Sequence, residues 1–148
     1  MQRSDFEIMA PAGSRETLAA ALQAGADSVY FGIGALNMRA HSAGGFTIDD
    51  LNEIAALCRE HGAKSYLTVN TVIYDGDLAA MREIVSAAKA AGVSAVIASD
   101  VAVMQCCREL GVEVHLSTQL NIANVEALRF YAQFADVVVL ARELTLRQ

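Results

Sequence analysis

Tryptophan is absent from this sequence, proline occurs once and cysteine three times. Three cysteines cannot all pair within one chain, and the spacing of Cys58, Cys106 and Cys107 fits neither a disulfide scaffold nor a zinc knuckle. Thiols on helix faces in a reducing compartment are the simpler interpretation. The near absence of proline, together with 54% hydrophobic residues, argues against intrinsic disorder. We therefore expect a compact fold.

Positive charge and long apolar runs are also scarce. The chain has 11 Lys and Arg against 17 Asp and Glu, and its net charge of -6 opposes attraction to a polyanion. No apolar run approaches the roughly 20 residues that a membrane-spanning helix needs, and residues 1–5 lead into a short strand rather than a signal-peptide core. We expect a cytoplasmic protein with no membrane span and no strong nucleic-acid binding by this segment.

One junction recurs along the chain, in which a helical run ends in glycine and passes almost at once into a β-branched strand. Glycine is favoured there because the residue after a helix commonly adopts a positive φ. The glycines concerned are Gly25, Gly62, Gly92 and Gly111. Residues that can cap a helix precede the helical patterns with similar regularity, and these are Ser14, Thr47, Asp77, Asp100 and Asn124.

Strand-like segments alternate with these helices. The predicted strands are residues 6–10, 28–31, 64–70, 95–99, 113–117 and 136–140. Alternation of this kind favours a parallel sheet with right-handed crossovers. The fold class is therefore α/β.

The faces of the strands distinguish a barrel from an open sheet. Strands of an open sheet are covered by helices on both faces and are nearly continuous apolar runs. Here Tyr66 and Thr68 alternate with Leu67, and His115 lies between Val114 and Leu116, which predicts one apolar face and one mixed face. The strand at 136–140 is apolar on both faces and argues the other way. We predict a TIM-barrel-like (β/α) fold, incomplete, of about six parallel strand and helix units.

The predicted barrel is not closed, because closure normally takes eight strands and about 250 residues. The unpaired edges of a six-strand sheet invite pairing with another chain. We therefore expect a homo-oligomer or strand exchange between copies.

Loops that follow the strands carry the functional site in barrels of this type. The residues predicted to contact a substrate are Asn70, Ser117, Thr118, Gln119, Asn121, Arg142 and Glu143. The run from 117 to 124 holds more amides and hydroxyls than a cap and a turn require. The collection suits orientation of a ligand rather than nucleophilic attack, so the catalytic residues stay unknown.

Several of these signals have a second interpretation. Ala12 and Gly13 could hold an anion with their amides, or could form a tight turn before Ser14. Arg142 could bind a carboxylate or phosphate in bidentate fashion, or could pair with Glu143 to close the loop. Asp100 is more typical of a helix cap than of a catalytic acid.

His115 lies between Glu113 and Ser117 in alternation, which suggests a Ser/His/acid relay. Residues two apart on a strand lie about 7 Å apart, whereas a nucleophile and its base need about 3 Å. We therefore expect a structural histidine in the barrel lumen. The three histidines are scattered, so neither a metal site nor a cofactor is predicted in this segment.

An ordered set of short motifs is similar to a known family. Residues 9–13 (MAPAG), 24–32 (AGADSVYFG), 69–71 (VNT), 117–121 (STQLN) and 140–144 (LAREL) resemble the collagenase-like peptidase family U32. The resemblance implies that residues 1–148 are a single N-terminal barrel segment of a longer protein. It also implies two kinds of relative. Some members of the family are named as proteases, a few of them collagenases, and others help to hydroxylate tRNA bases, rRNA bases or a quinone precursor.

The hydroxylating relatives hold an iron-sulfur cluster on cysteines later in the chain, and the resemblance implies such a cluster only for the longer protein. The first functional expectation is thus the barrel part of a hydrolase, inactive as a segment alone. The alternatives are the scaffold half of an iron-sulfur-dependent hydroxylation enzyme, or a non-enzymatic module that a partner completes. A protein and an RNA substrate both stay open. An aldolase-like barrel is disfavoured because no lysine follows a strand.

Overall fold

The computed structural model describes residues 2–38, 45–145 and 147. Six strands form one sheet: β1 (Met9–Pro11), β2 (Ser28–Gly32), β3 (Lys64–Val69), β4 (Ala95–Ala98), β5 (Val114–Leu116) and β6 (Val137–Val138). The helices are α1 (Arg15–Gln23), α2 (Leu51–Glu60), α3 (Leu78–Ala91), α4 (Val101–Leu110) and α5 (Val125–Tyr131). Short 3-10 turns are η1 (Arg3–Asp5), η2 (Ile48–Asp50), η3 (Asp75–Asp77) and η4 (Thr118–Leu120).

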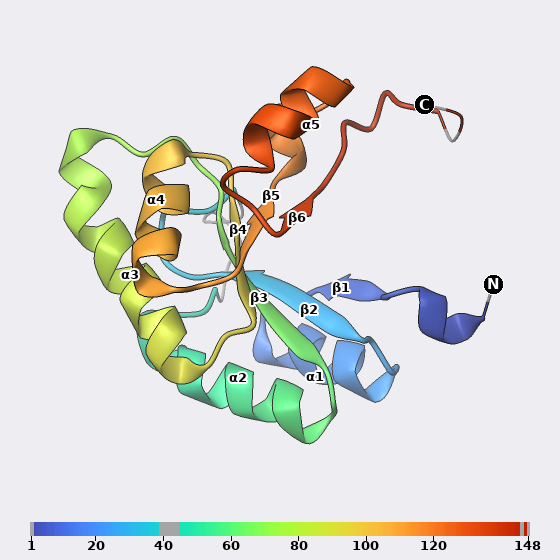
Figure 1. Ribbon diagram of the computed structural model, residues 1–148. Helices are drawn as coiled ribbons and strands as arrows, with labels where there is room; N and C mark the ends of the chain where they lie inside the picture. The colour runs from blue at the N-terminus through green and yellow to red at the C-terminus, as the bar shows by residue number, and fades with distance from the viewer. Residues whose placement is uncertain (1, 39–44, 146, 148) are drawn as a thin grey trace.

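The sheet follows the order of the sequence, β1 to β6, and every neighbouring pair is parallel. The strands curl into half a barrel, with the helices along the convex side and both termini on the open side (Figure 1). This confirms the predicted incomplete TIM-barrel-like fold. The outermost strands, β1 and β6, each pair on one side only within the described sheet. Pairing of these edges with another copy stays a prediction.

Two of the predicted strands differ from the structure by more than one residue at an end, and the other four differ by one residue at most at either end. Residues 3–5 form η1, and β1 begins only at Met9, so the predicted strand at 6–10 was placed too early. The predicted strand at 136–140 was too long, because β6 contains only Val137 and Val138. Residues 136–140 are apolar on both faces, as in a buried strand, and this pattern did not indicate that β6 lies at the edge of the sheet. An edge strand has a hydrogen-bonding partner on one side only, which favours a short element.

Helix ends follow the predicted capping chemistry closely. Ser14 Oγ accepts the Thr17 amide at 3.3 Å, Asp100 Oδ1 accepts the Ala102 amide at 2.8 Å, and Asn124 Oδ1 accepts the Ala127 amide. Gly92 and Gly111 end α3 and α4 with φ of 75° and 65°. Asp77 precedes α3 without capping it. Its carboxylate instead accepts the Tyr74 amide and so closes η3.

The two faces of the sheet differ as the alternation predicted. Phe31, Leu67 and Leu116 lie in the large core between the sheet and the helices. Tyr66, Ala95 and Ile97 form a separate small cluster, partly covered by Tyr30, on the concave face. Within the described ranges, no helix has the length and apolar character needed to cross a membrane.

Candidate functional site

The carboxyl ends of the six parallel strands meet along one rim of the half-barrel. Every residue predicted to contact a substrate or an anion lies in a segment that follows a strand. The anion candidates Ala12 and Gly13 follow β1, and the substrate candidates are Asn70 after β3, Ser117, Thr118, Gln119 and Asn121 after β5, and Arg142 and Glu143 after β6. The fold therefore brings these segments to the same end of the sheet. Contact with a ligand stays a prediction.

The segment after β1 uses its amides within the protein. The Ala12 amide donates to the Tyr30 carbonyl at 2.9 Å, and the Gly13 amide donates to Thr17 Oγ1 at 3.0 Å. An anion at this turn would have to replace these hydrogen bonds. Residues 12 and 13 thus form the tight turn before Ser14 that the sequence offered as an alternative to an anion site. Anion binding stays a prediction.

Hydrogen bonds tie the segments after β2, β3 and β4 together. Asn70 Oδ1 accepts the Met38 amide at 3.3 Å. Asp100 caps α4, as predicted, and its second oxygen accepts the Ile73 amide at 3.1 Å. The sequence indicated the cap, but not this second bond. Beside Asn70, the buried Thr71 hydroxyl has no hydrogen-bond partner among the described residues.

The polar run after β5 forms a tight turn. The Ser117 amide donates to the Ala98 carbonyl at 2.8 Å, and Ser117 Oγ accepts the Gln119 amide at 3.4 Å. Asn121 has a φ of 49°, a left-handed conformation that Asn tolerates better than most residues. Gln119 and Asn121 are exposed, whereas Ser117 is buried. Two amide side chains therefore remain accessible at the rim.

Arg142 and Glu143 are both exposed on the turn after β6. The ion pairs of the described residues include neither of them. The described ion pairs therefore give no support to the alternative in which the two residues pair to close the loop. A nearby bond, from the Ala141 amide to the Ile122 carbonyl at 3.0 Å, holds this turn against the segment after β5.

His115 differs from its prediction in one respect. Its Nε2 lies 2.8 Å from Glu113 Oε1, although the two residues are two positions apart on the chain. The prediction used the rise of the backbone, and the flexible Glu113 side chain spans that distance. Ser117 Oγ is bonded to the Gln119 amide, and the described residues show no hydrogen bond between Ser117 and His115. A serine relay therefore finds no support.

A cluster of charged and aromatic side chains surrounds His115 on the concave face. Glu7 accepts hydrogen bonds from Tyr66 Oη at 2.6 Å and from Lys64 Nζ at 2.8 Å, and the Tyr66 and His115 rings lie 4.6 Å apart. These groups line a cavity of about 290 Å³ together with Met9, Glu113, Val137 and Val139. Lys64 begins β3, so the cluster lies toward the end of the sheet opposite the rim.

The pKa of Glu7 reflects this cluster. Burial alone would raise it, but the hydrogen bonds from Lys64 and Tyr66 outweigh burial and lower the pKa from 4.5 to about 2. Burial and the bond to Glu7 raise the pKa of Tyr66 to about 12. Glu7 therefore stays ionised and Tyr66 stays protonated at neutral pH.

We expect Glu7→Gln to lower the free energy of unfolding at neutral pH by about 1 kcal/mol, a figure reduced for the partial exposure of Glu7. A carboxyl with a lowered folded pKa stabilises the protein above its unfolded pKa of 4.5, and this stability is lost as the pH falls toward 2. Urea denaturation from neutral to acidic pH measures both effects. The wild type should lose stability over this window more steeply than Glu7→Gln.

Glu83→Gln is the matched control, because Glu83 is exposed on α3 and its side chain has no hydrogen bond or ion pair with the other residues that the structure describes. Parallel acid profiles for the wild type and Glu7→Gln would contradict the assignment of this stability to Glu7.

The three cysteines do not fit an iron-sulfur cluster. Cys58 lies on α2, Cys106 and Cys107 on α4, and all three are buried in the core between the helices and the sheet. Burial raises the pKa of Cys58 to about 11 and that of Cys107 to about 12, so both keep their protons, whereas a cluster is held by thiolates. In the described part of the chain, no group of three His, Cys, Asp or Glu side chains is placed to hold a metal ion.

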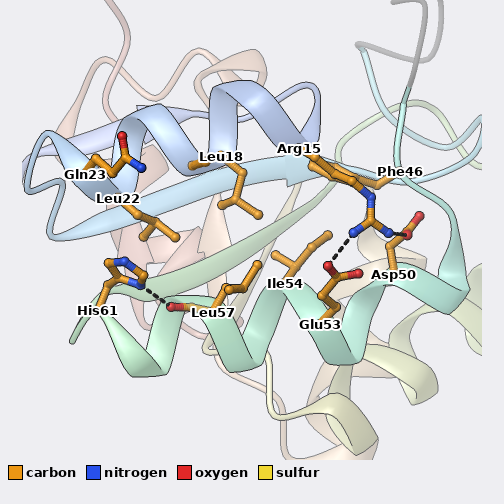
Figure 2. A pocket seen from close by; sticks show the side chains of 11 residues that line it. Arg15, Leu18, Leu22, Gln23, Phe46, Asp50, Glu53, Ile54, Leu57 and His61 are labelled. Atoms are coloured by element: carbon orange, nitrogen blue, oxygen red, sulfur yellow. Dashed lines mark hydrogen bonds and ion pairs between the residues drawn. The ribbon is translucent and has the colours of Figure 1, made fainter.

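A second cavity, of about 260 Å³, lies on the outside of the half-barrel between α1 and α2. Figure 2 shows its apolar floor, to which Leu18, Leu22 and Ile54 contribute, and the two polar ends. Arg15 binds Asp50 and Glu53 at one end, and His61 Nδ1 lies 2.9 Å from the Leu57 carbonyl oxygen at the other. No pattern in the sequence indicated this groove, because it depends on the spacing of two helices. Its Arg15 end adjoins the segment after β1, whereas His61 lies at the far end of α2.

Comparison with known proteins shows to which family the chain is related. The model of peptidase family U32 matches residues 13–148. The chain is 68% identical over its whole length to a collagenase of Porphyromonas gingivalis, of which it covers 36%. It is 44% identical to an uncharacterized protease of Methanocaldococcus jannaschii, over 96% of this chain and 35% of that one. It is 36% identical to tRNA hydroxylation protein P1 of Bacillus subtilis, over 93% of this chain and 33% of that one.

Solved structures agree on the fold. A U32 peptidase superposes with a TM-score of 0.72 at 12% identity, over 90% of this chain and 57% of that one. Deoxyribose phosphate aldolase of Aeropyrum pernix superposes with a TM-score of 0.69 at 15% identity, over 90% of this chain and 63% of that one. The chain spans about a third of the length of the three relatives named above. The family model and the identity along the whole chain lead to one conclusion: this chain belongs to peptidase family U32.

Proposed function

We propose that this chain is the N-terminal barrel part of a hydrolase that cleaves polypeptides. The observation that carries the proposal is the 68% identity, over the whole chain, to a relative named collagenase. This match extends over all 148 residues, so it includes the segments after the strands as well as the core. In barrels of this architecture the rim is where substrates bind.

The chemistry of the rim is compatible with a peptide substrate. A peptide backbone offers amide donors and carbonyl acceptors, and the exposed amides of Gln119 and Asn121 can pair with both. Among the described residues, the exposed guanidinium of Arg142 forms no ion pair. Arg142 could bind a substrate carboxylate through two parallel hydrogen bonds. The role of this segment would be to orient the substrate.

A catalytic nucleophile is not part of the proposal for this segment. Proteolysis needs an activated nucleophile or a metal-bound water, and the buried cysteines and the Glu113–His115 pair supply neither at the rim. The reacting groups would come from the remainder of a longer protein, as the greater length of the relatives suggests. The 148-residue chain alone should be inactive.

The test is hydrolysis of gelatin by the protein at its full length, followed as the release of new α-amino groups. We expect release by the full-length protein and none by residues 1–148 alone. Arg142→Ala should lower kcat/KM about tenfold if Arg142 binds a substrate carboxylate. Arg129→Ala is the control, because Arg129 is exposed on α5 and its guanidinium pairs with Glu126, one turn earlier on the same helix. Failure of the full-length protein to release amino groups would contradict the proposal.

A second candidate is the scaffold half of an iron-sulfur-dependent hydroxylation enzyme that acts on tRNA or rRNA bases or on a quinone precursor. The observation that favours it is the 36% identity to tRNA hydroxylation protein P1. The cysteines of this chain do not fit the cluster, so cysteines elsewhere would have to hold it. Hydroxylated bases in tRNA exposed to the full-length protein, without new peptide termini from gelatin, would favour this candidate over the first.

A further inference from the structure

Large apolar side chains are exposed on the rim, in the segments that follow β2, β3 and β4. Tyr74 is 71% exposed, Val72 67% and Met38 64%, and Leu78 and Val101 are also exposed. Apolar residues on a surface are ordinary when they are scattered, but a group of them beside a candidate site marks an interaction surface. We call these five residues the apolar lip.

Hydrogen bonds hold together the loops that carry the apolar lip. The Met38 amide is bonded to Asn70, which follows β3, so the segment after β2 is tied to the segment that carries Val72 and Tyr74. The Ile73 amide is bonded to the carboxylate of Asp100, the residue that precedes Val101. These two bonds fix three loops side by side. The lip therefore borders Asn70, one of the predicted substrate contacts.

In the segments after β3 and β4 the charges around the apolar lip have one sign, while Arg39, next to Met38 in the sequence, lies outside the described residues. Asp75, Asp77 and Asp100 lie in the same loops, whereas residues 65–81 and 94–107 contain no Lys or Arg. Asp75 is exposed, and among the described residues no hydrogen bond or ion pair occupies its carboxylate. An acidic surface attracts cationic groups and repels phosphates. The local charge thus favours a basic polypeptide over a nucleic acid.

We propose that the apolar lip docks an extended polypeptide segment in which apolar side chains stand beside Lys or Arg. Tyr74 supplies a large ring that loses little conformational entropy on contact, and Val72 and Val101 extend the apolar area. Asp75 selects the cationic residues of the segment. This inference rests on the proposed function, because it names the class of polypeptide that reaches the same rim.

The experiment measures binding to the full-length protein by fluorescence anisotropy. The probe is a labelled peptide of Gly-Leu-Arg repeats, compared with the same peptide carrying Glu in place of Arg and with a single-stranded oligouridylate of equal length. We expect the basic peptide to bind most tightly and Tyr74→Ala to weaken it about tenfold. Asp75→Asn should reduce the preference for the basic over the acidic peptide.

The matched control is Phe130→Ala, because Phe130 is an aromatic residue 56% exposed on α5, away from the rim. Equal losses in Tyr74→Ala and Phe130→Ala would reveal unspecific adhesion and overturn the proposal. Tighter binding of oligouridylate, lost in Tyr74→Ala, would make nucleic acid the occupant. A Tyr74→Cys thiol that does not react with maleimide in the full-length protein would mean that another part of the protein covers the lip.

The docking test and the hydrolysis test fail independently. If Tyr74→Ala binds the peptide as tightly as the wild type and the protein still cleaves gelatin, only the proposal for the apolar lip is contradicted. Peptide binding that depends on Tyr74, in a protein that cleaves nothing, would contradict the hydrolase alone.

Discussion

Replacement of Phe31 with alanine should lower the free energy of unfolding by about 3–5 kcal/mol, the usual cost of truncating a fully buried aromatic side chain. Phe31 lies on β2 and is 0% exposed. Its ring meets Phe46 edge to face, with centroids 5.9 Å apart. Alanine would leave a cavity beneath the helices and remove the support of Phe46, which lines the groove between α1 and α2. A loss of this size is a large part of the stability of a typical domain, about 5–15 kcal/mol.

Urea denaturation monitored by circular dichroism measures this change, with Phe6→Ala as the control. Phe6 is 54% exposed before β1, so its truncation should change stability by less than about 0.5 kcal/mol. A Phe31→Ala protein that unfolds at the same urea concentration as Phe6→Ala would show that the convex face of β2 is not packed as described.

The two faces of the sheet could be predicted from the sequence. The side chains of a strand alternate between two faces, so the pattern of apolar and polar residues on β3 and β5 was enough to assign the concave face. Helix ends were equally accessible, because a capping residue such as Asp100 acts on amides only two or three positions away. Both kinds of prediction depend on interactions that are local in the sequence.

Contacts between segments far apart in the sequence could not be predicted in this way. The bond between Asn70 and the Met38 amide depends on how the loop after β2 folds, and the bond between Asp100 and the Ile73 amide depends on the register of β3 and β4. The apolar lip follows from these bonds and was missed for that reason. The Glu113–His115 contact was missed because a backbone spacing says little about the reach of a long side chain.

Replacement of Gly32 with alanine should cost about 2–4 kcal/mol, because it combines overpacking with the loss of buried hydrogen bonds. A Cβ at this last residue of β2 would lie 2.7 Å from Asn37 Nδ2 and nearer still to Asn37 Cγ. Asn37 is 4% exposed, and its Nδ2 donates to the Ile33 carbonyl at 3.0 Å and to the Gly34 carbonyl at 3.1 Å. The added methyl group would force Asn37 out of this position and loosen the loop that carries Met38.

Urea denaturation again provides the measurement, and Gly76→Ala in η3 is the control, because no heavy atom lies within 4 Å of a Cβ built there. Its effect should stay within about 0.5 kcal/mol. The double variant Gly32→Ala with Asn37→Ala separates the two costs, since it removes the clash but not the loss of the hydrogen bonds. We expect the double variant to be more stable than Gly32→Ala alone. If the losses in stability of the two single variants add up in the double variant, Gly32 is needed for a reason other than the position of Asn37. If Gly32→Ala is as stable as the wild type, the close approach of residue 32 to Asn37 is contradicted.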